Sequence, residues 1–191
     1  MNYITLKNIA NQKIIDGVKV KPVDRPAGER GWNQEFMSSS DKWTDFFNQE
    51  YLPVHGYVSE TKSWVARDEN LWHVHPNPAH PQGLAQVDRW VMLKNEIIAA
   101  VADTRPNSPT IGLLNLFHMG EADDLRYMLW IPPQVLHGFM ALSQEALFLN
   151  VTNQAYDPEK IEGRIPFEQA AIKLVDGRLF SWELIRQDLK K

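Results

Sequence analysis

The chain has 191 residues, enough for one domain that buries about 70% of the surface its unfolded chain would expose. Its net charge of −4 comes from Lys and Arg residues scattered among acidic ones, so we expect no nucleic-acid partner. The absence of cysteine excludes disulfides and a thiol nucleophile, and the lack of a long apolar run predicts no membrane association and a cytoplasmic location.

Short β-branched runs open the chain, and we expect strands at residues 4–6, 13–15 and 18–20. A polar stretch follows, in which three consecutive serines at 38–40 predict a helix start before Asp41. These features predict an N-terminal region of short strands and turns rather than long helices.

The middle of the chain alternates short strand-like segments with turn residues, at 54–58, 63–66, 71–75, 88–93, 96–102, 110–117, 127–131, 138–142 and 146–152. Lys94 and Asn95 separate two apolar runs and predict a hairpin turn. Such even spacing of short strands favours a β-sandwich or a closed barrel over a parallel α/β sheet.

The C-terminal part has helical periodicity at residues 166–174 and 181–190, where Leu184, Ile185 and Leu189 share one face. We find no repeat and no domain boundary. The chain is therefore expected to form one domain over 1–191, with N-terminal strands at 1–30, a barrel at about 31–155 and a helical part at about 156–191.

Two histidines share one strand-like run. His73 and His75 are two residues apart, so their side chains leave the same face of a strand, about 7 Å apart along it. Two imidazoles at this spacing can share a metal ion. They can equally be polar residues on a solvent face, with Pro76 as an ordinary strand terminator.

Two more segments support a metal site. Asp88 stands seven residues before Asn95, and residues 132–137 read Pro-Pro-Gln-Val-Leu-His. This arrangement resembles the two-motif cupins, whose second motif is Pro-x-Gly-x-x-His, although Gln134 replaces the glycine. The resemblance implies convergence of four ligands, His73, His75, Asp88 and His137. Three imidazoles and a carboxylate suit Fe(II), Mn(II), Ni(II) or Zn(II), and we expect no organic cofactor.

Longer motifs carry a more specific resemblance. Residues 131–143 read Ile-Pro-Pro-Gln-Val-Leu-His-Gly-Phe-Met-Ala-Leu-Ser, and residues 103–112 read Asp-Thr-Arg-Pro-Asn-Ser-Pro-Thr-Ile-Gly. Residues 29–35 contain Arg-Gly followed by Glu, and residues 156–163 contain Tyr-Asp-Pro and Glu-Gly. In this order the four segments resemble those of the dTDP-4-dehydrorhamnose 3,5-epimerase family.

This resemblance implies an all-β fold, a cupin-type double-stranded β-helix (jelly-roll) barrel with short C-terminal helices. It also implies a homodimer that binds a nucleoside-diphosphate sugar. Arg30, Glu35 and Glu162 match positions that hold the nucleotide in the family, and His137 matches a pocket histidine. An Arg side chain suits bidentate phosphate contact.

The family's chemistry does not carry over cleanly. Epimerisation beside a ketone needs a base, an acid on the other face, and positive charge near the enolate oxygen. The family uses a His oriented by an Asp, a Tyr and a Lys. Here the matching positions, and hence the candidate catalytic residues, are His75 for the base, Gln169 near the Asp and Asn150 for the Tyr. The Lys falls on Asp88.

Asn150 cannot return a proton near neutral pH, and Asp88 would repel an enolate. The replacement of glycine by His73 and of lysine by Asp88 instead completes a metal-ligand set. Three alternatives remain open: a metal-assisted enzyme acting on a nucleotide sugar or a similar polar substrate, a divergent 3,5-epimerase that uses His75 with other acids, and a non-catalytic sugar-nucleotide binder.

Overall fold

The computed structural model describes residues 1–47, 49–75, 85–142, 144–157, 159 and 162–191. Pro76, interpreted above as a strand terminator, lies outside the described residues. So do Ser143 and Pro158, which belong to the motifs quoted above.

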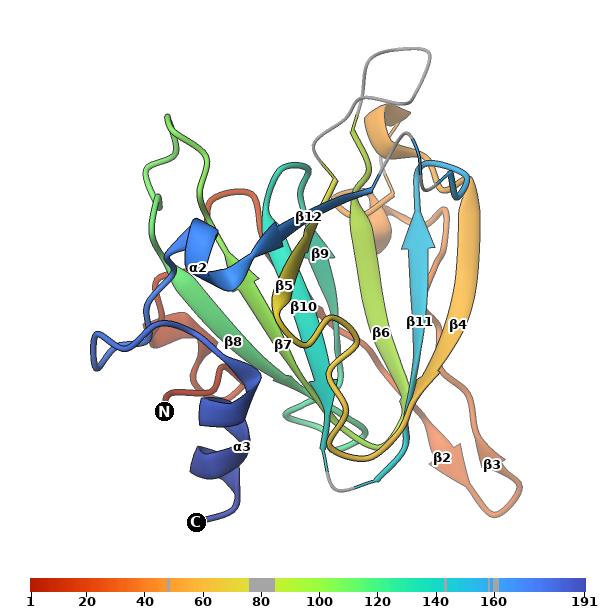
Figure 1. Cartoon of the computed structure of the whole chain (residues 1–191). Helices are drawn as coiled ribbons and strands as arrows, with labels where there is room; N and C mark the ends of the chain where they lie inside the picture. The colour runs from red at the N-terminus through yellow and green to blue at the C-terminus, as the bar shows by residue number, and fades with distance from the viewer. Residues whose placement is uncertain (48, 76–84, 143, 158, 160–161) are drawn as a thin grey trace.

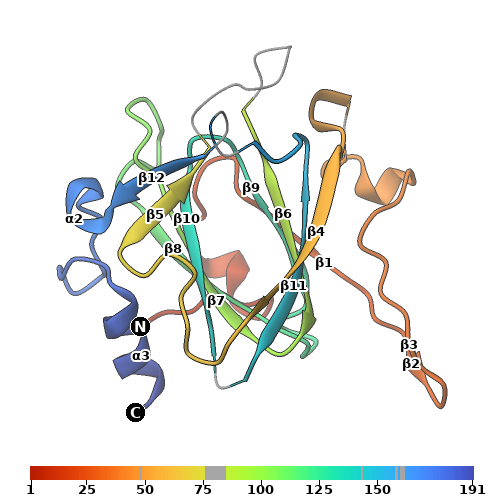
Figure 2. The same cartoon turned by 45° about the vertical axis from the view of Figure 1, so that its right-hand side comes forward.

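Two five-stranded antiparallel sheets face each other and form a barrel (Figures 1 and 2). The sheet that we call the Asp88 sheet has the order β1-β9-β6-β11-β4, with bounds Lys19–Pro22, Tyr127–Ile131, Asp88–Lys94, Ala146–Thr152 and His55–Thr61. The sheet that we call the histidine sheet has the order β12-β5-β10-β7-β8, with bounds Gly163–Pro166, Leu71–Val74, Leu136–Ala141, Ile97–Ala102 and Leu114–Met119. The predicted all-β jelly-roll barrel is confirmed.

The hairpin predicted at Lys94 and Asn95 is wrong. β6 pairs with β9 and β11, whereas β7 pairs with β8 and β10. The turn exists, with Asn95 in the left-handed region at φ 58°, but it carries the chain from the Asp88 sheet to the histidine sheet. Local residues specify the turn, and only long-range pairing decides where the next strand goes.

Two of the three predicted N-terminal strands are also wrong. Residues 4–6 contribute only an isolated parallel bridge between Ile4 and Phe117, residues 13–15 form no strand, and a 3-10 helix, η1, spans Ile9–Asn11. Only the run at 18–20 becomes a strand, as part of β1. Ile4 and Ile15 are buried in the core, so burial rather than sheet pairing explains their apolar character.

The segment expected as a strand at 63–66 has only a bridge from Ala66 to Met140. The serines at 38–40 precede a short 3-10 helix, η2 (Asp41–Trp43), which is followed by η3 (Gln49–Tyr51). Both helices lie on the outer face of the Asp88 sheet, where Trp43 and Phe46 form a hydrophobic cluster with residues of β6 and β9.

The C-terminal prediction is half right. Residues 163–166 form β12, and only Phe167–Ala170 form a helix, α2. The last predicted helix is confirmed as α3 (Trp182–Leu189), whose first turn is capped by the Ser181 side chain. Ile185 is fully buried in a hydrophobic cluster on the outside of the histidine sheet, and Leu184 and Leu189 pack against that cluster.

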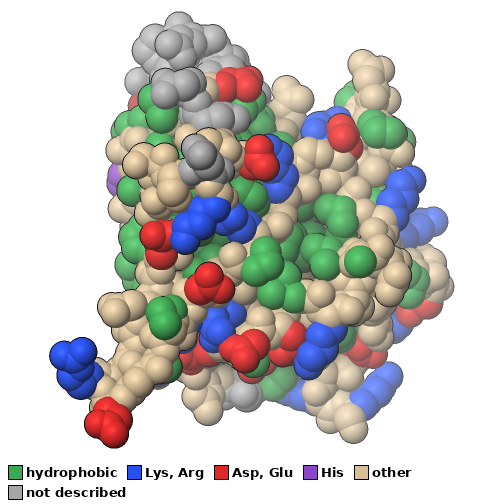
Figure 3. Space-filling model, turned by 180° about the vertical axis from the view of Figure 1, so that it is seen from behind, with side chains coloured by type: hydrophobic (Ala, Val, Ile, Leu, Met, Phe, Trp, Pro, Cys, Tyr) green, Lys and Arg blue, Asp and Glu red, His purple; other side chains and the backbone are tan. Residues whose placement is uncertain are grey.

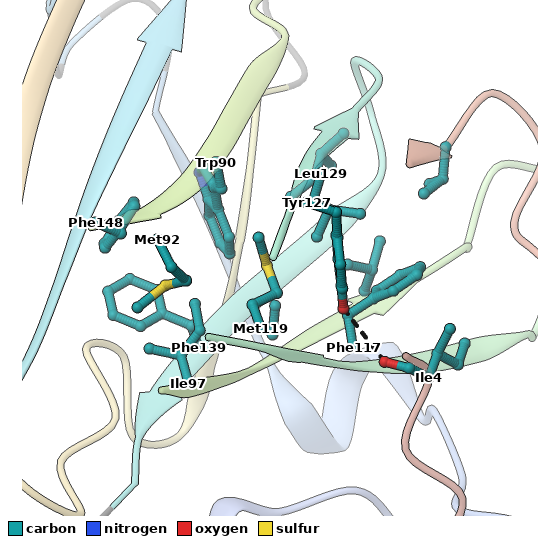
Figure 4. Close-up of a cluster of buried hydrophobic side chains, with 14 of the residues drawn as sticks. Ile4, Trp90, Met92, Ile97, Phe117, Met119, Tyr127, Leu129, Phe139 and Phe148 are labelled. Carbon is teal, nitrogen blue, oxygen red and sulfur yellow. Dashed lines mark hydrogen bonds between the residues drawn. The ribbon is translucent and has the colours of Figure 1, made fainter. Parts of the chain in front are cut away.

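Alternation along the strands separates an inner core from an outer one. In β6, Trp90 and Met92 point into the barrel, whereas Val91 belongs to the outer cluster beneath η2. Figure 4 shows Trp90 and Met92 beside Phe139 and Phe148 in the inner core. These side chains fill one end of the barrel, so a cavity can form only toward the other end.

A two-stranded hairpin, β2 (Ala27–Gly28) and β3 (Gly31–Trp32), projects away from the barrel (Figure 1).

From behind, basic and acidic side chains are intermixed over the surface (Figure 3), in keeping with the scattered charge of the sequence. Among the described residues, no helix has the length and apolar character needed to cross a bilayer.

The motif at residues 103–112 is a loop between β7 and β8 that a buried carboxylate organises. Asp103 is fully buried and accepts bonds from the Arg105 backbone at 3.1 Å, the Arg105 Nε at 2.9 Å and the Thr110 hydroxyl at 2.6 Å, and it also accepts from the Ser108 hydroxyl. Burial opposes its ionisation, but these donors, with Arg105 first, hold the pKa of Asp103 well below its usual range.

We expect Asp103→Asn to lower the free energy of unfolding by about 2–4 kcal/mol, because the amide cannot accept all these bonds and leaves buried donors unpaired. Since the folded-state pKa of Asp103 is depressed, its stabilisation is full above about pH 4 and is lost as the pH falls. Urea denaturation across pH should show this. Asp123→Asn, at a side chain that is 94% exposed, is the control and should change little. Equal stabilities of the two variants would contradict this role.

Candidate functional site

A cavity of about 570 Å³ opens between the two sheets at the end of the barrel that the inner core leaves unfilled. Trp90, Phe139 and Phe148 form its apolar wall toward the core. Arg67 and Arg164 also line it, together with the carboxylates of Asp68, Asp88 and Glu162. Its size lies within the range of small-molecule pockets.

Three histidines from the histidine sheet meet in this cavity. Trp72 and Val74 face the outer cluster under α3, so alternation along β5 turns His73 inward, and His75 follows directly. His137 lies opposite His73 in the pairing of β10 with β5. The ring centroids are 4.6–5.2 Å apart. One ring nitrogen of each histidine lies within 4.8 Å of those of the other two, as a shared metal ion requires.

The Asp88 carboxylate faces this cluster from the opposite sheet. Its Oδ2 atom lies 3.0 Å from His75 Nε2 and 3.6 Å from His137 Nε2, yet within the described part of the chain it accepts no hydrogen bond of acceptable geometry. His137 donates its Nδ1 hydrogen to the Val135 carbonyl at 3.0 Å, which leaves Nε2 with a lone pair. Two electron-pair donors, His137 Nε2 and Asp88 Oδ2, therefore face each other.

Burial lowers the pKa of His137 to about 3 despite the nearby Asp88, so this imidazole is neutral at physiological pH. Burial also opposes ionisation of Asp88, but His75 first, and then His137 and Asn150, outweigh it and hold the pKa of Asp88 well below its usual range. Neutral imidazole and ionised carboxylate are the protonation states that bind metal ions.

Two further carboxylate and amide contacts complete the cluster. Glu162 pairs with His73 Nε2. Burial opposes ionisation of the Glu162 carboxyl, but the contact with His73 outweighs burial and lowers the pKa of Glu162. Gln86 Nε2 lies 3.1 Å from Asp88 Oδ1 and 3.0 Å from His75 Nε2. Sequence reasoning missed Gln86, because it precedes β6 and carries no motif of its own.

Asn150 and Tyr57 lie side by side on β11 and β4. Asn150 Nδ2 donates to Asp88 Oδ1 at 2.6 Å and to the Tyr57 hydroxyl at 3.0 Å. Burial, and then the charge of Asp88, raise the pKa of Tyr57 to about 12. Sequence reasoning missed Tyr57, since a lone tyrosine in a strand gives no signal until its neighbouring strand is known.

The predicted site residues thus separate into two groups. His73, His75, Asp88, His137, Asn150 and Glu162 come together at the cavity. Gln169 lies on α2 with an exposed side chain and is not among the residues that line the cavity.

Arg30 and Glu35 are also absent from the cavity of their own chain. Arg30 is exposed in the turn of the β2–β3 hairpin. Glu35 is exposed beyond it, where its carboxylate accepts from Trp43 Nε1 at 2.6 Å and pairs with Lys42 at 2.8 Å.

Gln134, at the place of the cupin glycine, has φ 65°. This left-handed conformation is one that glycine adopts easily, in keeping with the glycine of the cupin motif, and a non-glycine residue there bears a cost of about 1 kcal/mol. The turn nevertheless forms and delivers His137 to the cavity, so the substitution does not prevent the motif from positioning its histidine.

Known proteins provide an independent comparison. The model of a family described as dTDP-4-dehydrorhamnose 3,5-epimerase matches residues 14–181. A probable low-salt glycan biosynthesis epimerase of Haloferax volcanii is 33% identical over 156 residues, which cover 81% of this chain and 89% of that protein.

Solved structures share the fold. A dTDP sugar isomerase from Desulfovibrio desulfuricans superposes with a TM-score of 0.68 at 21% identity, covering 95% of this chain and 96% of its own. A dTDP-6-deoxy-D-glucose-3,5-epimerase from Legionella pneumophila, in complex with dTDP-4-keto-L-rhamnose, superposes with a TM-score of 0.66 at 21% identity, covering 93% and 94%.

Proposed function

The chain belongs to the dTDP-4-dehydrorhamnose 3,5-epimerase family of nucleotide-sugar epimerases, and we propose that its cavity binds a nucleoside-diphosphate sugar and exchanges protons on carbons beside a sugar carbonyl. The observation that carries this proposal is the family match over residues 14–181, joined to a cavity of about 570 Å³ with titratable groups on both walls. Arg67 and Arg164 supply positive charge for a pyrophosphate. The sugar nucleotide bound by the Legionella protein supports a ligand of this class.

The chemistry needs positive charge where the carbonyl oxygen becomes negative. The resemblance assigns that role to a lysine, whose position Asp88 occupies here. A buried carboxylate at this place would raise the barrier rather than lower it. A cation that Asp88 itself attracts would supply the missing charge.

We propose that His73, His75, His137 and Asp88 hold a divalent metal ion of the Fe, Mn, Ni or Zn type. The donor set fits such an ion, because the bond from Nδ1 leaves His137 Nε2 with a lone pair that faces Asp88 Oδ2 at 3.6 Å. The bond from His137 Nδ1 to the Val135 carbonyl is the outer contact that metal-bound histidines usually make. A bound ion would polarise the sugar carbonyl. Glu162, which lines the cavity beside His73, would then accept the carbon-bound proton.

A second candidate is a metal-free epimerase in which His75 is the base and Asp88 orients it. The 3.0 Å separation of His75 Nε2 from Asp88 Oδ2 favours this alternative, since a proton on His75 would turn the contact into a charge-assisted bond. In that case Asp88 would serve as the histidine's partner in place of the carboxylate that the family resemblance puts near Gln169.

Metal content separates the two candidates. We expect the purified protein to carry about one divalent ion per chain, and a chelator to lower its Tm, because an ion that binds only the folded state stabilises it. His73→Ala should weaken metal binding by about tenfold or more. Even substitution of a residue that only hydrogen-bonds to a metal ligand lowers the metal affinity about 10–100-fold. Elemental analysis and calorimetric titration with Zn²⁺ and Mn²⁺ measure both effects.

His118→Ala is the matched control, because His118 is 23% exposed like His73 and also pairs with a glutamate, Glu96, outside the cavity. Equal metal affinities of the two variants would contradict the proposed ligand set. Turnover of a dTDP-sugar by metal-free protein would favour the second candidate. Binding of dTDP without any proton exchange, with or without metal, would leave a sugar-nucleotide binder.

We further propose a homodimer in which the β2–β3 hairpin of one protomer reaches the nucleotide in the cavity of its partner. Arg30 and Glu35 match nucleotide-binding positions but are remote from the cavity of their own chain. Trp32 on the same hairpin is 50% exposed, with Arg25 stacked over its ring at 4.1 Å. A two-stranded hairpin is marginal alone and would gain by burying such a side chain.

Arg30→Ala should weaken dTDP binding by about tenfold or more, because a charge-assisted hydrogen bond contributes about 1.5–3 kcal/mol. Isothermal titration calorimetry measures this change. Arg178→Ala, at an exposed arginine paired with Asp176, should leave the affinity unchanged. An unaltered affinity in Arg30→Ala would remove this residue from the nucleotide site.

Light scattering should give about twice the 22.0 kDa mass of one chain at micromolar concentration. Trp32→Ser should shift the protein toward monomer, because it removes apolar area from the proposed interface. A monomeric wild type would rule out an arrangement in which a partner's hairpin completes the site.

A further inference from the structure

The cavity has a second wall that the family's catalytic positions do not explain. Its residues come from β4 at alternate positions, so that His55, Tyr57 and Ser59 face the cavity while their neighbours point outward. β4 is the edge strand of the Asp88 sheet, and it lies across the cavity from the histidine sheet. β4 and β5 belong to different sheets, on opposite sides of the barrel (Figure 2). Tyr57 on β4 and His73 on β5 therefore line the cavity from different sheets.

Asn150 fixes the Tyr57 hydroxyl in this position. The Asn150 Oδ1 atom accepts from the Arg89 backbone at 3.0 Å, so the amide can have only one orientation, with Nδ2 toward Tyr57 and Asp88. Nδ2 donates to the Tyr57 oxygen at 3.0 Å. Because the phenol oxygen accepts this bond, its own hydrogen is not used in it and can be donated to a ligand.

We propose that Tyr57 is the proton donor of the reaction, and that it replaces, from the neighbouring strand, the acid whose place Asn150 occupies. This inference rests on the proposed function, because it needs a carbon acid in the cavity. The register pairs Asn150 directly with Tyr57, so moving the phenol from β11 to β4 keeps it on the same face of the Asp88 sheet.

The step balances without a further reactant. A base next to the histidine sheet (Glu162, or His75 in metal-free protein) takes the proton from a carbon beside the ketone, and the electron pair of the C–H bond passes into the enolate. The Tyr57 O–H bond then breaks as a new C–H bond forms on the opposite face, which inverts the carbon. The tyrosinate that remains accepts the Asn150 N–H bond. The protonated base then gives its proton to water and Tyr57 regains one from water, so both groups return to their starting states.

The environment of Tyr57 agrees with this role. Its pKa of about 12, raised by burial and then by Asp88, keeps the hydroxyl protonated at neutral pH, as a donor requires. Its side chain is nevertheless 41% exposed, so it is accessible from the cavity, and removal of the hydroxyl leaves no cavity in the core.

The test uses dTDP-4-dehydrorhamnose in D₂O and separates deuterium uptake at the carbons beside the ketone from inversion of those carbons. Wild type should do both. Tyr57→Phe should lower the inversion rate by about 100-fold or more while deuterium exchange persists, because the base can return deuterium to the face from which it removed hydrogen. Mass spectrometry follows exchange, and NMR follows inversion.

Tyr51→Phe is the matched control, since the Tyr51 ring packs on Trp130 outside the cavity, and it should invert at the wild-type rate. A folded Tyr57→Phe variant that inverts as fast as wild type would overturn the role of Tyr57 and leave the proposed function intact. Loss of exchange together with inversion in Tyr57→Phe would make Tyr57 the base and would also overturn its role as donor. Wild type that neither exchanges nor inverts would remove the proposed function, and this inference with it.

Discussion

Asp88 holds an ionised carboxylate, 2% exposed, at the closed end of the cavity, where bulk water cannot solvate it. An isolated charge in such a place costs several kcal/mol, so compensating groups must surround it. Asn150 and Gln86 donate to one of its oxygens, and the other oxygen faces the imidazoles of His75 and His137. The geometry of the site follows from this need for compensating groups around one buried carboxylate.

The same carboxylate joins the two sheets. It stands at the start of β6, whereas the histidines come from β5, the residue after it, and β10, so the contact crosses the interior of the barrel. By resemblance, the family has a lysine at this position and a glycine at that of His73. Under the proposed function, replacing a cation by an anion and adding a third imidazole would convert a cavity that carries its own positive charge into one that binds a cation.

Much of the fold could be predicted from local pattern. β9 and β11 have the predicted bounds, because their β-branched and aromatic runs end at turn residues. The hairpin at Asn95 could not be predicted correctly, since the same turn can join paired strands or lead to another sheet. Ile4 and Ile15 were wrongly expected in strands. Their apolar character predicts that the side chains are buried, as they are, but not whether the backbone belongs to a strand.

The residues of the candidate site likewise include some that local sequence could predict and some that depend on long-range pairing. His73, His75, Asp88 and His137 could be brought together from motif spacing, because the cupin motifs specify which strand residues face the interior of the barrel. Tyr57 could not, since it meets Asn150 only through a pairing of strands 93 residues apart in the chain. Nor could the sequence reveal that Arg30 and Glu35 lie outside the cavity of their own chain, because that depends on the direction in which the hairpin projects.

The central claim is that a cation occupies the space between Asp88 and the three histidines. Anomalous diffraction from crystals grown with Mn²⁺ or Zn²⁺ tests it most directly. The account predicts a strong anomalous peak about 2.1 Å from a ring nitrogen of each histidine, with the Asp88 carboxylate completing the set. The contradictory result is no peak at that point, with Asp88 accepting a hydrogen bond from a protonated His75.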